Sequence, residues 1–292
     1  MVVRINRYEN EQIIEWKWAS DNQLIPSPFF TSCFIIEDIL IDTGAPASTD
    51  ELKSFLEKYQ EERMINKCII THIHEDHSGG ASMIQKNFQI PLFAHSKAIP
   101  ILKNKHNYPQ YRKMTWGEER LPVNAEKIPN LVDSSSRKYE FEVLHMPGHA
   151  PGLIALIERS KQWVFTSDAV QSKYKMIFGA NSDIQEDISL IYKSISNLYN
   201  ITAGMNNLKI FSSGQGVFKG REFLKEKLME IKSLQKQVHT LFDEFSEKYE
   251  KDEKIYKKVL RELFGRETVI GKLTKEDLST MNLIKSLKKW EL

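Results

Sequence analysis

Residues 71–80, with the sequence THIHEDHSGG, place three histidines and two acids within seven positions and end in two glycines. The whole chain has only eight histidines. The overlapping run KCIITHIH (67–74) is rich in β-branched residues and is typical of a strand buried on both faces. The segment is therefore either a polar surface turn that is rich in histidine or a metal site at the end of a strand.

Strand geometry favours the metal site. Side chains two positions apart on a strand point the same way, so His72 and His74 can face one metal ion. The chain must then turn into a helix, which brings Asp76 and His77 round to the same pocket, and the two glycines allow that turn and a close approach. The helical zinc-protease pattern is excluded, because it needs histidines four apart. Imidazole together with carboxylate suits zinc, iron or manganese.

The composition is that of an ordinary globular protein. The 292 residues suffice for one large domain with or without an appendage, and an apolar fraction of 41% supplies a core. The net charge is +2 with acids and bases interleaved, which argues against a dedicated nucleic-acid surface and against a disordered chain. Cys33 and Cys68 lie in apolar runs, so we expect buried free thiols in a reducing compartment.

The first residues of the chain are charged throughout and contain no apolar segment like that of a signal peptide. No uncharged apolar run approaches the length of a membrane span. We therefore expect a soluble, cytoplasmic protein with no membrane partner. The sequence leaves the oligomeric state open, a homo-oligomer included.

The sequence changes in character near residue 217. Before this point, short apolar runs that suit strands alternate with turns and helical stretches. After it the strand signal disappears: residues 220–249 carry apolar side chains at three- and four-residue steps, typical of an amphipathic helix, and the last helix is expected to begin at Thr274. We predict an α/β domain over residues 1–216 and an all-α appendage over 217–292 that closes one side of an active-site cleft.

Four short segments occur in an order that resembles the metallo-β-lactamase superfamily. They are LIDTG (40–44), THIHEDH (71–77), MPGHAPG (146–152) and FTSD (165–168). The resemblance covers roughly residues 20–216 and implies a four-layer αββα sandwich. It is specific for the fold and much less so for the substrate.

The resemblance also implies a role for each motif residue. The implied metal ligands form two groups that share a carboxylate: His72, His74 and His149 for the first ion, Asp76 and His77 for the second, and Asp168 between them. Asp42 would support the histidine ligands from behind. The implied cofactor is one or two zinc ions, with iron or manganese as alternatives.

One position departs from the family pattern. The fifth motif usually presents a histidine just after the last core strand, whereas the matching stretch IFSSGQG (210–216) has Gln215 in that place. A neutral carboxamide oxygen binds a second metal more weakly than an imidazole does. Three outcomes stay open for the second site: lower affinity, occupation by a harder ion, or no ion.

The implied function is metal-dependent hydrolysis of a small ester, thioester or lactone, as in the branch that resembles glyoxalase II and the lactonases. True β-lactamases of the family commonly have cysteine where Asp168 stands and are exported, which argues against antibiotic hydrolysis. A hydroxide held by the metal would attack the carbonyl, and Asp76 would be the catalytic residue that orients or deprotonates that water.

Two other functions compete with hydrolysis. A ligand-binding or regulatory protein of the same fold with weak turnover is motivated by Gln215. A nuclease is motivated by the lysine-rich tail, but the interspersed acids and the lack of a basic stripe with aromatics argue against nucleic acid as a partner.

Several further residues have two readings each. His145 suits packing or support of the ligands, with a role as ligand as the alternative, and His95 suits a structural role, with a position facing the cleft as the alternative. His239, within the long helix, suits a structural role, with replacement of the missing fifth histidine as the alternative. Tyr174 suits the wall of the cleft, with donation to an oxyanion as the alternative. The aromatic insertion 105–116 is either a substrate-facing loop or a hydrophobic flap.

Overall fold

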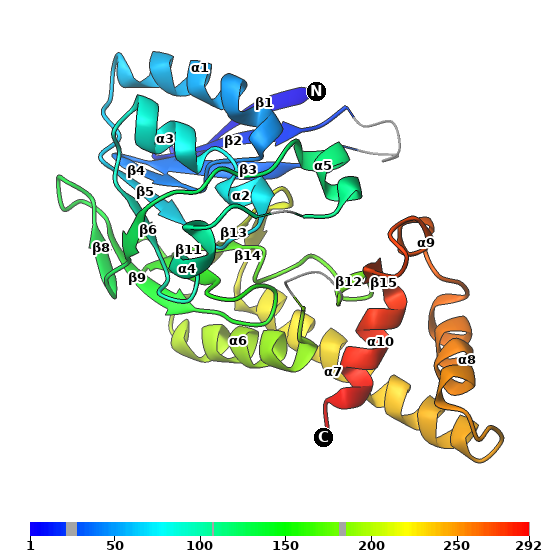
Figure 1. Ribbon diagram of the computed structural model, residues 1–292. Helices are drawn as coiled ribbons and strands as arrows, with labels where there is room; N and C mark the ends of the chain where they lie inside the picture. Colours follow the sequence, from blue (N-terminus) through cyan, green and yellow to red (C-terminus); the bar gives the residue numbers. More distant parts are fainter. Residues whose placement is uncertain (22–27, 107, 181–184, 292) are drawn as a thin grey trace. The chain divides into compact units, whose positions relative to one another are not determined.

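The computed structural model describes residues 1–21, 28–106, 108–180 and 185–291. The chain divides into two compact units, whose elements are drawn in Figure 1. The first consists of Met1–His145, Pro151–Asp168 and Asn207–Phe218, and the second of Met146–Ala150, Ala169–Asn206 and Lys219–Leu292. The expected appendage thus lies mostly in the second unit, together with two internal segments, and its boundary after residue 216 stays a prediction.

The first unit contains a sheet of seven strands whose order in space follows the chain. The strands are β1 (Val2–Tyr8), β2 (Ile13–Ala19), β3 (Thr31–Ile36), β4 (Ile39–Ile41), β5 (Lys67–Ile70), β6 (Leu92–Ala94) and β7 (Ala125–Lys127). Pairing is antiparallel from β1 to β4 and parallel from β4 to β7. The apolar run predicted as a strand over residues 67–74 is a parallel strand only over Lys67–Ile70, whose burial on both faces explains the lack of alternation there.

A second sheet of six strands has the order β14-β13-β11-β10-β9-β8. Its strands are β14 (Gly216–Lys219), β13 (Lys209–Ser212), β11 (Trp163–Ser167), β10 (Ile154–Glu158), β9 (Glu140–His145) and β8 (Leu131–Asp133). Its apolar side chains form one core with those of the first sheet: Phe34 contacts Phe165 edge-on at 5.3 Å, and Phe165 stacks on Phe211 at 4.7 Å. Sheet-on-sheet burial thus stabilises the first unit.

The helices of the first unit are η1 (Pro46–Ser48), α1 (Thr49–Gln60), α2 (Glu75–Ser78), α3 (Ala81–Asn87), α4 (Ile99–Leu102) and α5 (Gln110–Trp116). Helices α1 and α3 lie along one face of the seven-stranded sheet (Figure 1). Leu52 and Leu56, one turn apart, are the buried residues of α1 and point its apolar stripe inward. Helix α2 is a single turn that directly follows the end of β5.

The second unit is mostly helical. Its elements are β12 (Phe178–Gly179), α6 (Ile188–Ile201), α7 (Arg221–Ser246), α8 (Asp252–Phe264), α9 (Val269–Leu273), β15 (Leu278–Ser279) and α10 (Thr280–Lys289). The amphipathic helix expected over 220–249 is α7, which buries Leu224, Ile231 and Val238 and packs against α6, α8 and α10. Within the described part of the chain, no helix is both long and apolar enough to cross a bilayer.

Two expectations for the tail are wrong. The last helix begins at Thr280 rather than Thr274, because Lys275 and Glu276 adopt positive φ and interrupt it. The strand signal also does not end completely, since β15 pairs antiparallel with β12. This two-residue pairing depends on contacts distant in sequence and overrides local propensity. Ser279 then caps α10 through its side chain, which accepts a hydrogen bond from the Asn282 amide.

Candidate metal centre

The HxHxDH segment is placed by the end of β5 and the single turn of α2. Strand β5 ends at Ile70, so His72 lies in the loop that follows, and His74 is the residue just before α2. The helix carries Asp76 and His77, as the sequence predicts. The two histidines therefore do not meet by strand alternation but by the loop that joins strand to helix.

The two glycines after α2 serve close packing rather than an unusual backbone conformation. Gly79 and Gly80 have φ of −62° and −83°, which any residue adopts. A Cβ on Gly79 would lie 2.3 Å from the Pro46 nitrogen, and one on Gly80 would lie 2.4 Å from the Thr43 carbonyl oxygen. Glycine is therefore required because the backbone after α2 packs directly on the loop after β4.

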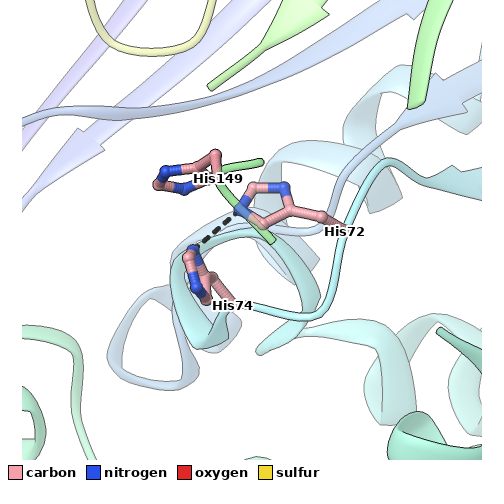
Figure 2. A group of neighbouring side chains, drawn as sticks. All are labelled: His72, His74 and His149. Carbon is pink, nitrogen blue, oxygen red and sulfur yellow. Dashed lines mark hydrogen bonds between the residues drawn. The ribbon is translucent and has the colours of Figure 1, made fainter. Parts of the chain in front are cut away.

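His72 and His74 present nitrogen atoms to each other. The Nε2 atom of His72 lies 3.0 Å from Nδ1 of His74, the contact dashed in Figure 2. Two nitrogens bound to one tetrahedral zinc at about 2.0–2.1 Å lie about 3.3 Å apart. The observed spacing is close to that value, so the pair needs only a small adjustment to bind a single ion. His72 is fully buried, and His74 is half-buried.

Asp42, just after β4, organises the interior side of this cluster. Its buried carboxylate accepts hydrogen bonds from the Thr71 amide (2.7 Å) and the Thr71 hydroxyl (2.7 Å), and lies 2.8 Å from His77 Nδ1. The Thr71 hydroxyl is also 3.1 Å from His72 Nδ1. Through these contacts Asp42 holds both rings with their Nε2 atoms turned away from it, as the predicted supporting role requires.

The backbone at this point is strained. Asp42 has a φ of 62° and Ser167 a φ of 49°, in the left-handed region that residues other than glycine seldom adopt. The Ser167 hydroxyl lies 3.4 Å from a carboxylate oxygen of Asp42, so the two strained residues meet between the two sheets. Such strain concentrates at functional sites.

His77 and two carboxylates form a second group of ligand atoms. Its Nε2 atom lies 3.4 Å from an oxygen of Asp76 and 3.4 Å from an oxygen of Asp168. Ligand atoms of His72, His77 and Asp168 all lie within 4.8 Å of one another. The structure thus brings together, within the first unit, five of the residues that the motifs single out: His72, His74, Asp76, His77 and Asp168.

The electrostatics of His77 suit a cation. Burial alone lowers the pKa of His77, but the carboxylates of Asp76, Asp168 and Asp42 outweigh burial and raise the pKa well above its usual value. Among the residues that the structure describes, no hydrogen-bond partner is found for the buried Nε2 atom. A buried imidazole nitrogen with carboxylate oxygens 3.4 Å away and no shorter hydrogen bond is the arrangement expected of a metal ligand.

His149 belongs to the second unit, on the connection between β9 and β10, and is also labelled in Figure 2. Its Nδ1 atom lies 2.7 Å from a carboxylate oxygen of Glu186, whose other oxygen accepts a hydrogen bond from the Gly179 amide at 2.7 Å. A carboxylate on Nδ1 fixes the tautomer that carries its lone pair on Nε2. This is the pattern of a histidine that binds metal.

Gln215 lies in the turn between β13 and β14, and its side chain is exposed. The turn itself is held firmly, because the Gly214 amide donates to the Ser32 hydroxyl at 2.9 Å and Lys17 donates to the Gly214 carbonyl at 3.0 Å. Its role as a metal ligand stays a prediction.

The remaining histidines and Tyr174 have structural contacts. His95 and His145 stack in parallel at 4.1 Å, and burial, the charge of His95 and that of Lys97 lower the pKa of His145 to about 4. His239 Nε2 lies 3.2 and 3.1 Å from two carbonyl oxygens at the end of α10. The Tyr174 hydroxyl is buried and accepts a hydrogen bond from the Gln171 amide at 3.2 Å. These contacts favour a role as a wall residue over donation of a hydrogen bond to an oxyanion.

Sequence reasoning missed Glu186, Ser167 and a buried ion pair between Glu75 and Arg112. Glu186 is separated from His149 by 37 positions, and only its place beside Asp187, which caps α6, distinguishes it from other surface acids. The pair between Glu75 and Arg112 likewise spans 37 positions. No local pattern reports contacts of this range, which are set by the tertiary fold.

The chain belongs to the metallo-beta-lactamase superfamily, whose family model matches residues 26–189, more than half of its length. This confirms the family that the four motifs resemble. Probable metallo-hydrolase YflN of Bacillus subtilis is 26% identical over an alignment of 145 residues that covers 45% of this chain and 55% of YflN. Hydroxyacylglutathione hydrolase GloC of Haemophilus influenzae is 26% identical over 170 residues, covering 51% of this chain and 71% of GloC.

The match therefore spans about half of YflN and under three-quarters of GloC. Among solved structures, a metallo-beta-lactamase from Pontibacter korlensis superposes with a TM-score of 0.60 over 79% of this chain and 99% of that one, at 13% identity. At this identity the likeness shows the fold. It confirms the predicted fold class, mixed α/β sheets of the metallo-beta-lactamase type with additional C-terminal helices.

Proposed function

We propose that the chain is a metal-dependent hydrolase that cleaves a small ester, thioester or lactone. The observation that carries the proposal is the buried Nε2 atom of His77, which faces Asp76 and Asp168 beside the pair His72 and His74. Family membership supports a metal at this place. The substrate class is supported by GloC, whose name gives an acylated glutathione as its substrate.

We assign the first ion to His72, His74 and His149. Chain connectivity supports His149, although it belongs to the second unit: its segment leaves the second sheet at His145, which pairs with Ile154 across β9 and β10. The Ile154 amide donates to the Thr71 carbonyl at 3.0 Å, directly before His72. The strand that follows the connection is thus bonded, at Ile154, to the residue directly before His72.

We assign the second ion to Asp76 and His77, with Asp168 between the two ions and Gln215 as an added, weaker ligand. Imidazole and carboxylate groups in this mixture suit zinc, with iron or manganese as alternatives. The fit rests on the donor set: carboxylates surround a buried imidazole nitrogen for which no hydrogen-bond partner is found in the described chain. A cation would bind the His77 nitrogen and reduce the repulsion between the two carboxylates beside it.

A divalent ion at this place supplies Lewis acidity, which polarises a carbonyl oxygen and makes water acidic near neutral pH. The chain's own residues position the reaction. Asp42 holds the proton on His77 Nδ1 and Glu186 holds that on His149 Nδ1, so each ring directs Nε2 to the metal side. The Asp76 carboxylate, on the rigid turn of α2, orients the attacking water and accepts its proton.

Hydrolysis assays on metal-loaded protein test the proposed function. The panel consists of S-lactoylglutathione, an acyl-homoserine lactone, a p-nitrophenyl ester and a bis-p-nitrophenyl phosphodiester, each with zinc-loaded and chelator-treated protein. We expect zinc-dependent turnover of at least one carbonyl substrate and none of the phosphodiester. Turnover of the phosphodiester alone supports the nuclease, and tight metal binding without turnover of any substrate supports the ligand-binding alternative.

We predict that Gln215→His tightens the second metal site, because imidazole binds zinc more strongly than a carboxamide oxygen does. Competition titration with a chromophoric zinc chelator, at constant occupancy of the first site, measures the change. A gain of about tenfold is expected for one better ligand. Gln215→Asn is the matched control, since it keeps the amide and shortens its reach. Equal affinity in Gln215→His and wild type would show that this turn does not face the second ion.

A further inference from the structure

Glu75 and Arg112 form a buried ion pair with paired hydrogen bonds. Arg112 of α5 donates from Nε to one carboxylate oxygen of Glu75 and from Nη2 to the other, both at 2.5 Å. The side chains are 3% exposed for Glu75 and 12% exposed for Arg112. A guanidinium is the side chain that presents two parallel N–H groups to a carboxylate, so the pair fixes orientation as well as distance.

Glu75 is the first residue of α2, and Asp76 and His77 are the next two. An isolated helix of one turn is unstable, so contacts outside α2 must hold its shape. The Thr31 hydroxyl donates to the Asp76 carbonyl at 2.5 Å, and the Thr43 amide donates to the His77 carbonyl at 2.7 Å. These bonds hold the carbonyl side of the turn, and the bridge to Arg112 holds its first side chain.

Arg112 extends from a segment that is itself anchored. The Tyr108 hydroxyl donates to the Gly117 carbonyl at 3.0 Å, and a Cβ on Gly117 would lie 2.7 Å from the Ala47 amide nitrogen. The buried guanidinium of Arg120 donates to the carbonyls of Leu102 and Ile101 at the end of α4. The insertion that contains α5 therefore offers a fixed point from which Arg112 can orient α2.

We propose that Arg112 is a positioning residue: through its fork to Glu75 it sets the orientation of Asp76 and His77 and thereby the affinity of the second metal. The inference rests on the proposed metal centre. It gives the insertion 105–116 a role other than a substrate-facing loop or a hydrophobic flap, because its helix α5 supports the turn that carries Asp76 and His77.

Positioning and simple electrostatics predict different results for a change that keeps the charge. Arg112→Lys preserves the positive charge beside Glu75 but replaces the planar fork with a single ammonium. If only charge mattered, metal affinity would not change. If the fork orients α2, affinity for the second ion falls, and loss of such supporting contacts typically weakens metal binding by about 10- to 100-fold.

Cobalt(II) titration of the full chain tests the inference, because the visible absorption of bound cobalt reports both affinity and ligand geometry. We expect Arg112→Lys to weaken the second binding event about tenfold and to alter its spectrum, while the first event stays as in wild type. Lys113→Arg is the matched control: it is also a charge-conserving exchange on α5, but Lys113 pairs with Glu119 instead of Glu75. Wild-type affinity and spectrum in Arg112→Lys would overturn the inference.

A double-mutant cycle separates the bridge from two independent effects. Glu75→Gln should also lower the affinity for the second ion. The double variant should bind that ion no more weakly than the weaker of the two single variants, because both changes act through one bridge. Additive losses would contradict a shared bridge. Melting of the metal-free proteins accompanies the cycle, and a lowered melting temperature with unchanged cobalt binding would assign the pair to stability alone.

Failure of the proposed metal centre is distinguishable from failure of this inference. If wild type binds no cobalt, the proposed function is wrong, and hydrogen exchange in metal-free protein then decides the bridge. Faster exchange of the amides of residues 75–78 in Arg112→Lys, with no change in Lys113→Arg, would support positioning of α2. Unchanged exchange would overturn it.

Discussion

Asp76→Asn is expected to lower kcat by about a thousandfold, within the range typical of loss of a general base, on the carbonyl substrate that wild type hydrolyses fastest. Asparagine has the size of aspartate but neither its basicity nor its charge. The carboxylate lies 3.4 Å from His77 Nε2, where the second ion is proposed. The change also removes one of the carboxylates that raise the pKa of His77, so the stability of the metal-free protein is measured alongside kcat.

Kinetics at matched metal content, together with thermal melting of the metal-free proteins, check this result. Asp133→Asn on β8 is the control, because it makes the same chemical change at an exposed site. Activity close to wild type in Asp76→Asn at equal metal occupancy would remove Asp76 from the mechanism. A loss of activity accompanied by unfolding would assign the effect to structure instead.

Asp42→Asn is expected to reduce both stability and metal affinity. An amide in place of the carboxylate turns a donor toward groups that themselves donate, the Thr71 amide and hydroxyl and the His77 ring. One buried donor without an acceptor costs about 1–3 kcal/mol, so we expect a loss of about 3 kcal/mol in the free energy of unfolding. Release of the His77 ring should lower the affinity for the second ion by about 10- to 100-fold.

Asp38→Asn separates the two consequences of Asp42→Asn. Asp38 is also buried and accepts hydrogen bonds, from the Ser135 amide at 3.1 Å and from Asn66 at 3.2 Å, but it precedes β4 whereas Asp42 follows it. Denaturant unfolding of both variants should show comparable losses of stability. Zinc titration should show weakened binding in Asp42→Asn alone, and equal weakening in both would make the metal effect a general result of instability.

Much of the fold could be predicted because its local patterns agree with its long-range contacts. The β-branched run before Thr71 forms parallel strand β5, and the apolar steps after residue 220 form α7. The four motifs fall at strand ends or in the connections that follow them, where loops carry function. The start of α10 could not be predicted, because it depends on the pairing of β15 with β12.

The candidate site could be predicted as far as its motifs extend. The sequence itself places four candidate ligands close together: His72, His74, Asp76 and His77. The fold needs only one loop and one helical turn to bring their side chains together. Residues that contact the motif segments from elsewhere in the chain are distant in sequence and carry no pattern of their own. Glu186 and Arg112 appear in the sequence as ordinary charged side chains, and only the tertiary structure gives them partners.

Anomalous diffraction at the zinc absorption edge, from crystals of the zinc-loaded full chain, tests the metal centre most directly. The account predicts one peak bounded by His72 Nε2, His74 Nδ1 and His149 Nε2, and a second, weaker peak beside Asp76 and His77 Nε2. A zinc peak at other residues, or no peak at these atoms in crystals of protein that binds zinc in solution, would contradict the proposed metal centre.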